Sequence, residues 1–287
     1  MSNPRADYAP IHLRPPFKLP GGARVAVWPV VNVEEWDFNA PMARTYLPYP
    51  QGATVIPDVA NFGWFDYGLR VGFWRMKEVL DRHGIRATVS LNASICDSYP
   101  VLVEECLRAG WEILAHGFVQ RPLSVERDER EVIRRTLATI KSRTGRAPRG
   151  WMGPGLAETL HTPDILAEEG LAYVCDWCND DQPYRMKVKQ GGLVAIPYTL
   201  EINDIPIYVV KHASSPEIFN LARDQFDTLY REGARSARVM AISTHPYITG
   251  VPHRIKYYDQ IFDYIRQFEG VVFMTPGEIY DWYVQQG

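Results

Sequence analysis

The chain has few cysteines, four in 287 residues. A disulfide framework for a protein of this length would need more of them. Cys175 and Cys178 form a C-x-x-C pair, but no second Cys or His pair lies nearby to complete a zinc site. Residues 171–175 have a strand pattern, whereas a redox pair begins a helix. We therefore interpret the cysteines as structural or incidental thiols.

Long apolar segments and runs of one charge are also missing. The first residues contain no apolar signal-peptide segment, and no window offers the roughly 18 uninterrupted apolar residues that a membrane span needs. We therefore expect a cytoplasmic protein that does not bind a membrane. The formal net charge is −3, without a basic run or an acidic tail, which argues against nucleic acid as the main partner.

Several well-known catalytic motifs are absent. The sequence has no G-x-S-x-G turn for a serine nucleophile, no G-x-x-x-x-G-K-[ST] phosphate loop and no H-E-x-x-H metal motif. The turn Gly153-Pro154-Gly155 does not match a dinucleotide fingerprint, because Pro154 lacks an amide donor and the glycine spacing differs. The chemistry must therefore come from another set of side chains.

The sequence does contain enough apolar material for a large core, with 46% hydrophobic and 23% charged residues. Residues 1–22 are rich in proline and irregular, and we expect an arm that lies on the body or on a neighbouring subunit. Over residues 23–287 predicted strands and helices alternate without a composition break. This alternation indicates a single α/β domain with a mainly parallel sheet.

The expected elements follow from the spacing of apolar residues and from turn signals. The predicted strands are 24–31, 87–91, 111–116, 149–151, 171–176, 193–196, 207–210, 239–243 and 271–274. The predicted helices are 66–83, 98–109, 126–144, 162–169, 216–233, 256–268 and one that begins after Thr275. Residues 39–65 form a long aromatic loop in this interpretation, and we expect it to cover one side of the site.

Polar residues follow several predicted strands at the point where each strand ends. They are Glu34 with Glu35, His116, Trp151, Asp176 and His245. In parallel α/β folds chemistry collects at this end of the sheet, and these residues converge only if the strands close into a barrel or a strongly curved sheet. A simpler interpretation also exists, with the glutamates in a solvated loop and His116 as a hydrogen-bonded core histidine.

The order of these motifs resembles the polysaccharide deacetylase superfamily, the NodB-homology fold. The motifs are the acidic pair, His-Gly-x-x-x, Trp-x-x-Pro-Gly, Asp-Trp and Thr-His-Pro, spread over residues 24–286. The sequence is most similar to its cytoplasmic allantoinase-like and cyclic-imide-hydrolase-like branch. This resemblance implies a distorted (β/α) barrel, often a homotetramer, that hydrolyses a non-peptide carbon–nitrogen bond.

The resemblance also implies roles for individual residues. Glu34 stands where the family has its catalytic-base aspartate, and Glu35 where it has a metal-ligand aspartate. His116 matches the first ligand histidine, and His245 matches the catalytic acid. The family pattern expects a second ligand histidine at the position of Gln120.

Two departures from the family pattern concern the metal and the base. Gln120 replaces the second ligand histidine, and Met152 replaces an arginine that orients the base. Glu35, His116 and the neutral amide of Gln120 form a poor set of ligands for Zn²⁺. Zinc is therefore possible but its ligand set is incomplete, and the longer glutamates favour direct carboxylate catalysis.

Aromatic and polar residues beside these motifs are candidates for a substrate pocket. Trp36, Trp151, Trp177 and Tyr184 would form an apolar wall, and Asn179, Asp180, Glu201, Asn203 and Asp204 would supply polar contacts. Arg254, next to His253, would bind a substrate carboxylate or else form a surface salt bridge. Each of the others is equally compatible with a packing aromatic or a capping carboxylate.

Our leading hypothesis is a cytoplasmic amidohydrolase that acts on a small linear or cyclic amide, such as an imide or ureide. Glu34 or Glu35 would activate water, His116 would polarise the carbonyl directly or through a weakly held metal, and His245 would protonate the leaving nitrogen. One alternative is a metal-dependent N-deacetylase of amino-sugar derivatives. Another is a catalytically silent member that keeps the pocket for ligand binding.

Overall fold

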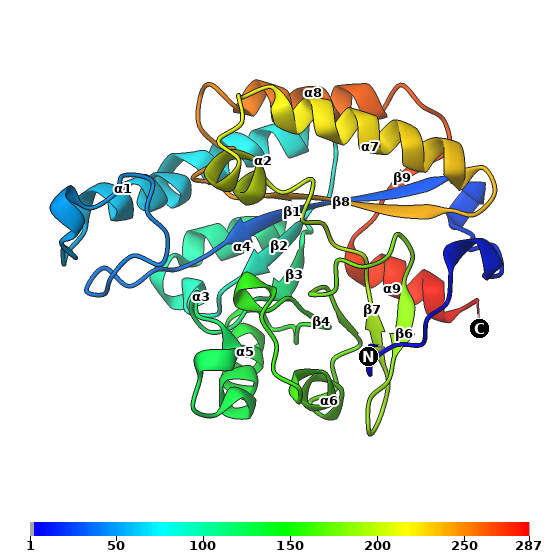
Figure 1. Cartoon of the computed structure of the whole chain (residues 1–287), viewed down its shortest axis with the longest axis horizontal. Coiled ribbons are helices and arrows are strands. Elements are labelled where there is room, and N and C mark those ends of the chain that lie inside the picture. The colour runs from blue at the N-terminus through cyan, green and yellow to red at the C-terminus, as the bar shows by residue number, and fades with distance from the viewer. Residues whose placement is uncertain (1–2, 287) are drawn as a thin grey trace.

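The computed structural model describes residues 3–286, so residues 1–2 of the predicted arm and residue 287 of the predicted domain lie outside the description. Its centre is one curled sheet with the strand order β6-β7-β5-β4-β3-β2-β1-β8, while β9 pairs with the first part of β1. Neighbouring strands are parallel except β6 and β7 (Figure 1). The strands are β1 Val25–Val33, β2 Thr88–Leu91, β3 Glu112–Ala115, β4 Gly150–Trp151, β5 Tyr173–Val174, β6 Tyr184–Met186, β7 Leu193–Ala195, β8 Arg238–Thr244 and β9 Val271–Phe273.

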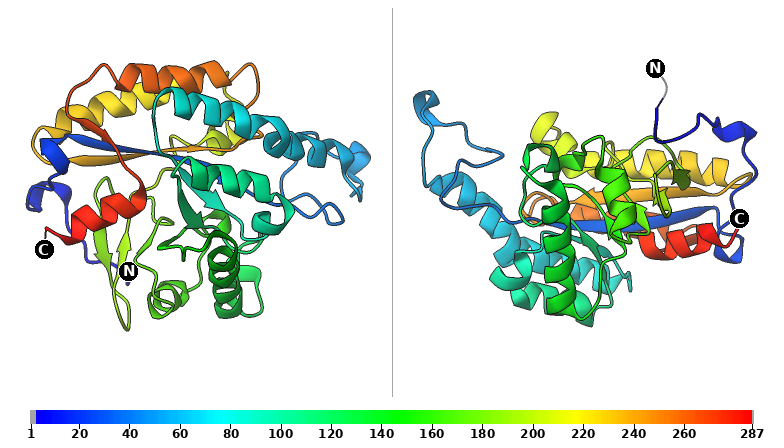
Figure 2. Two further views of the ribbon diagram at one scale, coloured as in Figure 1. Left: turned by 180° about the vertical axis from the view of Figure 1, so that it is seen from behind. Right: turned by 90° about the horizontal axis from the view of Figure 1, so that it is seen from below.

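Helices cover the convex side of this sheet, and α7 and α8 lie side by side next to β1 and β8 (Figures 1 and 2). None of the helices within residues 3–286 is long and apolar enough to cross a membrane. The α-helices are α1 Val59–Tyr67, α2 Phe73–Arg82, α3 Ile95–Ser98, α4 Pro100–Arg108, α5 Glu129–Thr144, α6 Thr162–Glu168, α7 Glu217–Gly233, α8 Ile255–Ile265 and α9 Pro276–Val284. Shorter helical turns of π type join α1 to α2 (Gly68–Gly72) and precede α7 (Ile205–Val210).

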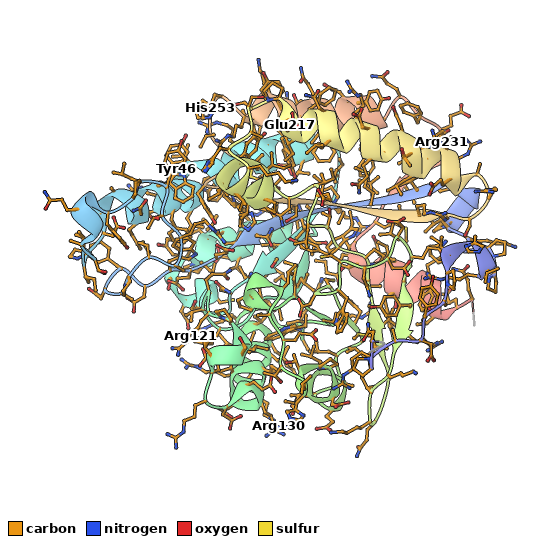
Figure 3. The ribbon with its side chains drawn as sticks, viewed as in Figure 1. Tyr46, Arg121, Arg130, Glu217, Arg231 and His253 are labelled. Carbon is orange, nitrogen blue, oxygen red and sulfur yellow. The ribbon has the colours of Figure 1, made fainter. Side chains whose placement is uncertain are left out.

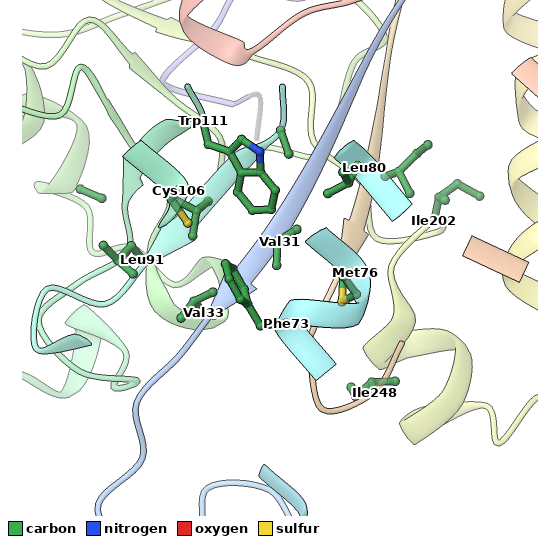
Figure 4. Packing of buried hydrophobic residues seen from close by; sticks show 14 of the residues in the cluster. Val31, Val33, Phe73, Met76, Leu80, Leu91, Cys106, Trp111, Ile202 and Ile248 are labelled. Atoms are coloured by element: carbon green, nitrogen blue, oxygen red, sulfur yellow. The ribbon is translucent and has the colours of Figure 1, made fainter. Parts of the chain in front are cut away.

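Alternation along the strands divides the core into two layers. On β1, Val31 and Val33 face the helices and pack near Phe73 and Met76 of α2 (Figure 4). Trp28, on the same strand, belongs to the second cluster inside the curl. Each fully buried side chain of this size contributes about 1.5–3 kcal/mol. Every second residue of a strand therefore belongs to the inner layer. The site residues described below continue this alternation just past the carboxyl ends of the strands.

The curl does not close into a regular barrel, because β6 and β8 at its two ends do not pair. Irregular chain fills this seam instead. The Val239 amide donates to the Asp181 carbonyl, and the Ser243 amide donates to the Ile202 carbonyl, both at 2.9 Å. The expectation of a single-domain distorted (β/α) barrel of the NodB type is confirmed.

The described part of the N-terminal arm lies on the body. Arg5 is paired with Asp164 at 2.9 Å, and the Phe17 carbonyl accepts from the Ala237 amide at the start of β8. The boundary between arm and domain at residues 22 and 23 stays a prediction.

Two sequence expectations about the elements were wrong. The helix expected to start at Asp66 begins at Val59 instead, and the Asp58 side chain caps it by accepting from the Asn61 amide. Its aromatic residues point in several directions and Gly63 interrupts them, so no apolar stripe marks its first turns. The strand expected at 207–210 is part of a π-helical turn that starts beside Pro206, which cannot donate to a sheet ladder.

Glycines let this helical segment approach the turn that follows β8. A Cβ atom on Gly72 would lie 2.1 Å from the Pro246 carbonyl oxygen, and one on Gly68 would lie 2.5 Å from the Tyr247 amide nitrogen. A Cβ atom on Gly250 would in turn lie 2.5 Å from the Cα atom of Gly72. The helix therefore contacts the backbone of this turn directly and fixes its position.

We expect Gly72→Ala to destabilise the protein by about 1–3 kcal/mol, because the added methyl group forces the turn after β8 to move. Gly63→Ala is the matched control in α1, where a Cβ atom meets nothing within 4 Å. That control should gain about 0.5–1 kcal/mol from the better helix propensity of alanine. Denaturant titration measures both, and a Gly72→Ala variant as stable as the wild type would contradict this packing.

Candidate active site

Strand alternation brings three reactive side chains to the inner face of the sheet. Glu34 follows β1, His116 follows β3 and His245 follows β8, each with the same parity as the inner core residues of its strand. They are 2%, 3% and 4% exposed. The curved parallel sheet therefore converges them in a place that is largely closed to bulk water.

The Glu34 carboxylate accepts from several donors. Gln120 Nε2 lies 2.8 Å from Oε1, and Trp36 Nε1 lies 3.1 Å from Oε2. The Tyr247 hydroxyl donates to Oε2 at 3.4 Å, and His245 Nε2 lies 3.4 Å from Oε1. Burial alone would raise the pKa of Glu34, but the hydrogen bond and charge of His245 outweigh it and lower the pKa to about 2.

His245 is held between two carboxylates. Its Nδ1 donates to Asp204 Oδ1 at 2.6 Å, and its amide donates to Asp204 Oδ2 at 2.7 Å. Thr249 donates to the same Oδ2 at 2.7 Å. Burial alone would lower the pKa of His245, but the charges and hydrogen bonds of Asp204 and Glu34 raise it to about 9. At neutral pH the ring is therefore a cation, and Nε2 carries a proton.

Together these groups form a base and an acid in contact. Glu34 keeps its charge and can accept a proton from water, while His245 can donate one from Nε2. Asp204 fixes the ring orientation and balances its charge. Sequence reasoning named Asp204 only as a possible pocket contact. Its one visible signal is a lone acid between apolar residues in the stretch 202–207.

His116 has a different protonation state. Its Nδ1 lies 2.6 Å from the Met152 carbonyl oxygen, which can only accept, so Nδ1 carries the proton. Burial lowers the pKa of His116, with the Glu34 charge opposing it. In this neutral form Nε2 is an acceptor, so the ring has no proton with which to polarise a carbonyl directly. The expectation of direct polarisation by His116 is therefore not supported by its hydrogen bonding.

Glu35 does not join this group. It follows Glu34 in the chain, so alternation turns its side chain to the other face. Its Oε2 atom is buried and has no hydrogen-bond partner within the described chain, and its charge is one of the causes, after burial and Asp66, that raise the pKa of Tyr99. The backbone of Glu35 is held by Asn92, whose Oδ1 accepts from its amide at 2.8 Å.

The candidate metal ligands therefore do not converge. The Gln120 amide group donates to Glu34, and its oxygen accepts from Asn92 at 3.4 Å. His116 is left as a lone imidazole, because Glu35 lies on the other face. Over residues 3–286 no group of three His, Cys, Asp or Glu side chains is arranged to hold a metal ion. The residues present do not fit the zinc site of the family.

The residues of the predicted aromatic wall lie in different parts of the structure. Trp36 lies in the site, where it bonds Glu34 and stacks on Phe65 with ring centroids 5.1 Å apart. Trp151 is fully buried in the outer layer of the core. Trp177 donates to Glu158 at 3.1 Å. The fourth member, Tyr184, donates from its hydroxyl to Asn179 at 3.0 Å. Of the four, Trp36 is the one that bonds the Glu34 carboxylate.

Of the predicted polar contacts, Asp204 lies in the site, while Asn179, Asp180, Glu201 and Arg254 lie elsewhere in the structure. Asn179, Asp180 and Glu201 line a cavity of about 1490 Å³ against the N-terminal arm, where Arg14 pairs with Asp180. Glu34, His116 and His245 do not line this cavity. Arg254 donates to the Ile248 carbonyl and stacks 4.1 Å above the Tyr208 ring. Substrate binding by these four predicted residues stays a prediction.

Two site residues had no sequence signal. Arg44 comes from the loop between β1 and α1 and donates from Nη1 to the Tyr247 hydroxyl at 2.6 Å. Tyr247 is buried and packs edge-on to Trp36 and Trp64, with ring centroids 5.9 and 4.8 Å apart. These rings form an aromatic wall next to Glu34 and His245.

A curled parallel sheet with a carboxylate–imidazole pair at its strand ends defines a NodB-type (β/α) barrel hydrolase. The family model for polysaccharide deacetylase matches residues 63–174. The chain is 30% identical to a Schizosaccharomyces pombe protein named for the polysaccharide deacetylases, over 91% of this chain and 90% of that protein. The chain therefore belongs to the polysaccharide deacetylase family, whose members hydrolyse carbon–nitrogen bonds other than peptide bonds.

Solved structures share the whole fold. A structure described as a polysaccharide deacetylase from Pseudomonas aeruginosa PAO1 has a TM-score of 0.84 at 26% identity and covers 95% of both chains. PuuE allantoinase has a TM-score of 0.85 at 24% identity and covers 98% of both chains. At 24% identity, the likeness to PuuE allantoinase shows a shared fold and nothing more.

We expect His245 to remain protonated through neutral pH and to titrate near pH 9, because its folded pKa is raised. The stability that its charge contributes is fully present below the unfolded pKa of about 6.5 and is lost as the pH rises through about 9. Imidazole NMR titration measures this directly. Asp204→Asn should lower the His245 pKa, while Asp180→Asn, paired with Arg14 away from the site, should not. A wild-type titration near the ordinary value would contradict the assignment.

Proposed function

We propose that the protein hydrolyses the carbon–nitrogen bond of a small linear or cyclic amide, such as an imide or ureide. The observation that carries this proposal is the buried row of Asp204, His245 and Glu34. Amide hydrolysis needs a base that takes a proton from water and an acid that protonates the leaving nitrogen. The charged Glu34 carboxylate and the protonated His245 ring, held by Asp204, match these two needs.

The proposed reaction uses the resting charges of the site. Glu34 takes a proton from water as its oxygen bonds to the carbonyl carbon. His245 then gives the Nε2 proton to the nitrogen as the carbon–nitrogen bond breaks, which leaves a carboxylic acid and an amine. Because four donors hold the resting Glu34 carboxylate, the entering water must replace at least one of them.

Burial supports a small substrate. Glu34 and His245 are nearly inaccessible, and the loop that carries Arg44 lies over the aromatic wall beside them. A long sugar polymer requires an open groove, whereas catalytic groups as buried as these suit a planar ring or a short acyl group. A cytoplasmic location and a homotetramer stay predictions that accompany this proposal.

A metal-dependent N-deacetylase of amino-sugar derivatives is the second candidate, favoured by the names of several relatives. The peptidoglycan deacetylase of Helicobacter pylori is 25% identical over 78% of this chain. Against it stands the ligand set, because Gln120 donates to Glu34 and Glu35 lies on the other face. A silent ligand-binding member is a third possibility, motivated by Gln120 and Met152.

We expect purified protein to lack stoichiometric zinc and to keep its activity after treatment with a chelator, because His116 has no second metal ligand beside it. Elemental analysis and assay before and after chelation measure both. Gln120→His, which restores an imidazole at the family position, should bind zinc more tightly than the wild type. Stoichiometric zinc whose removal abolishes activity would favour the deacetylase alternative.

Turnover of a panel of cyclic imides, ureides and acetylated glucosamine oligomers tests the function itself. We expect ring opening of at least one imide or ureide and a loss of about 10²–10⁴-fold in kcat for Glu34→Gln and for His245→Gln. Asp224→Asn, on an exposed side chain paired with Arg223, is the control and should keep full activity. Activity confined to the glucosamine oligomers would reject the proposal, and binding without turnover would favour the silent alternative.

A further inference from the structure

Arg44 places a positive charge beside the site, where burial opposes it but the charge of Glu34 acts on it from a distance and raises its pKa, and no carboxylate of residues 3–286 pairs with it directly. Its side chain makes one hydrogen bond within residues 3–286, from Nη1 to the Tyr247 hydroxyl. Among those residues no carboxylate oxygen lies within 4.0 Å of its guanidinium. Most of its five N–H donors are therefore available to a ligand.

This arrangement is costly unless an anion or a strong acceptor arrives. Arg44 is half-buried, and its guanidinium lies 5.7 Å from the centre of the Trp36 ring. An aromatic face offsets only part of the lost hydration of a charge. Arginines that serve stability alone usually have a carboxylate partner, as Arg14 and Arg5 do elsewhere in this chain.

The chain around Arg44 is fixed before a substrate enters. Asn61, which is 2% exposed, accepts from the amides of Tyr46 and Leu47 and donates to the Leu47 carbonyl. Tyr46, labelled in Figure 3 on the side of the molecule where α1 lies, packs on Trp64 with ring centroids 5.2 Å apart. Asn61 of α1 therefore fixes the backbone that follows Arg44, and Tyr247 holds the guanidinium itself, as preorganisation of a donor requires.

Amide hydrolysis creates a negative oxygen that needs such a donor. Two nearby polar groups are already committed, because His116 donates from Nδ1 to Met152 and His245 must protonate the nitrogen. Gln120 donates one of its two amide hydrogens to Glu34 and carries no charge. The Arg44 guanidinium has several unused donors and a full positive charge, and it is linked to Glu34 through the Tyr247 hydroxyl.

We propose that Arg44, held by Tyr247, binds the carbonyl oxygen of the substrate and stabilises the oxyanion formed on it. This inference rests on the proposed amide hydrolysis and assigns its missing electrophile. It makes Arg44 a catalytic residue, because its N–H groups contact the reacting carbonyl. Arginine also suits substrates with two neighbouring carbonyl oxygens, such as imides, since its planar fork can donate to both.

Kinetics of Arg44→Met test the role. The expected result is a fall in kcat of about 100-fold or more with little change in KM, because the contact strengthens in the transition state. Added guanidinium ion should restore part of the lost rate, and Arg44→Lys should retain more activity than Arg44→Met. Arg70→Met is the matched control, since Arg70 is 75% exposed and lies 3.7 Å from Asp66. A kcat of Arg44→Met within about threefold of the wild type overturns the proposal.

A binding measurement separates this inference from the choice of reaction. Methylphosphonate carries tetrahedral anionic oxygens like those of the intermediate, and calorimetry measures its affinity without turnover. We expect binding to the wild type and to Arg70→Met, with a loss of about tenfold or more in Arg44→Met. Equal affinity in Arg44→Met, or none in the wild type, overturns the role of Arg44. Binding that depends on Arg44 in a protein that hydrolyses no amide supports the site while rejecting the proposed function.

Discussion

Asp204, His245 and Glu34 form a row of alternating charges that the fold has withdrawn from water. Each charge is tolerated only because its neighbour is present, since an isolated buried ion costs several kcal/mol. Because each charge depends on its neighbour, the backbone segments that position the three residues must be held tightly against one another. The helix from Val59 to Arg82 contacts the turn after β8 through glycines, because that turn must hold His245 between two carboxylates.

In the reaction that we propose, the same row carries out the chemistry without a metal ion. Members with a metal use an ion as the electrophile, whereas the ligand positions here hold a single imidazole, His116, and an amide, Gln120, that has become a donor to Glu34. The charge that the ion would supply has a counterpart in two cations, His245 and Arg44. Base, acid and electrophile can thus all be assigned to side chains of the described chain.

Part of this site followed from the sequence, because strand ends are readable from it. Glu34, His116 and His245 each follow an apolar strand, and parallel strands place such residues on one rim. Asp204 was named only as a possible pocket contact, and Arg44 was not identified. Asp204 precedes a π-helical turn and Arg44 lies in an irregular loop, so only tertiary packing fixes their positions. Glu35 and the residues near Asp180 were predicted to join the site because they lie next to its motifs in the sequence. Strand alternation turns Glu35 to the other face, and the residues near Asp180 belong to the irregular chain that fills the gap between β6 and β8.

Neutron diffraction from crystals grown in deuterated solution at neutral pH would reveal whether Glu34 and His245 rest as a charged pair. We expect deuterium on both ring nitrogens of His245 and none on either oxygen of Glu34. A single deuterium on the His245 ring, or a deuterated Glu34 carboxyl group, would contradict it.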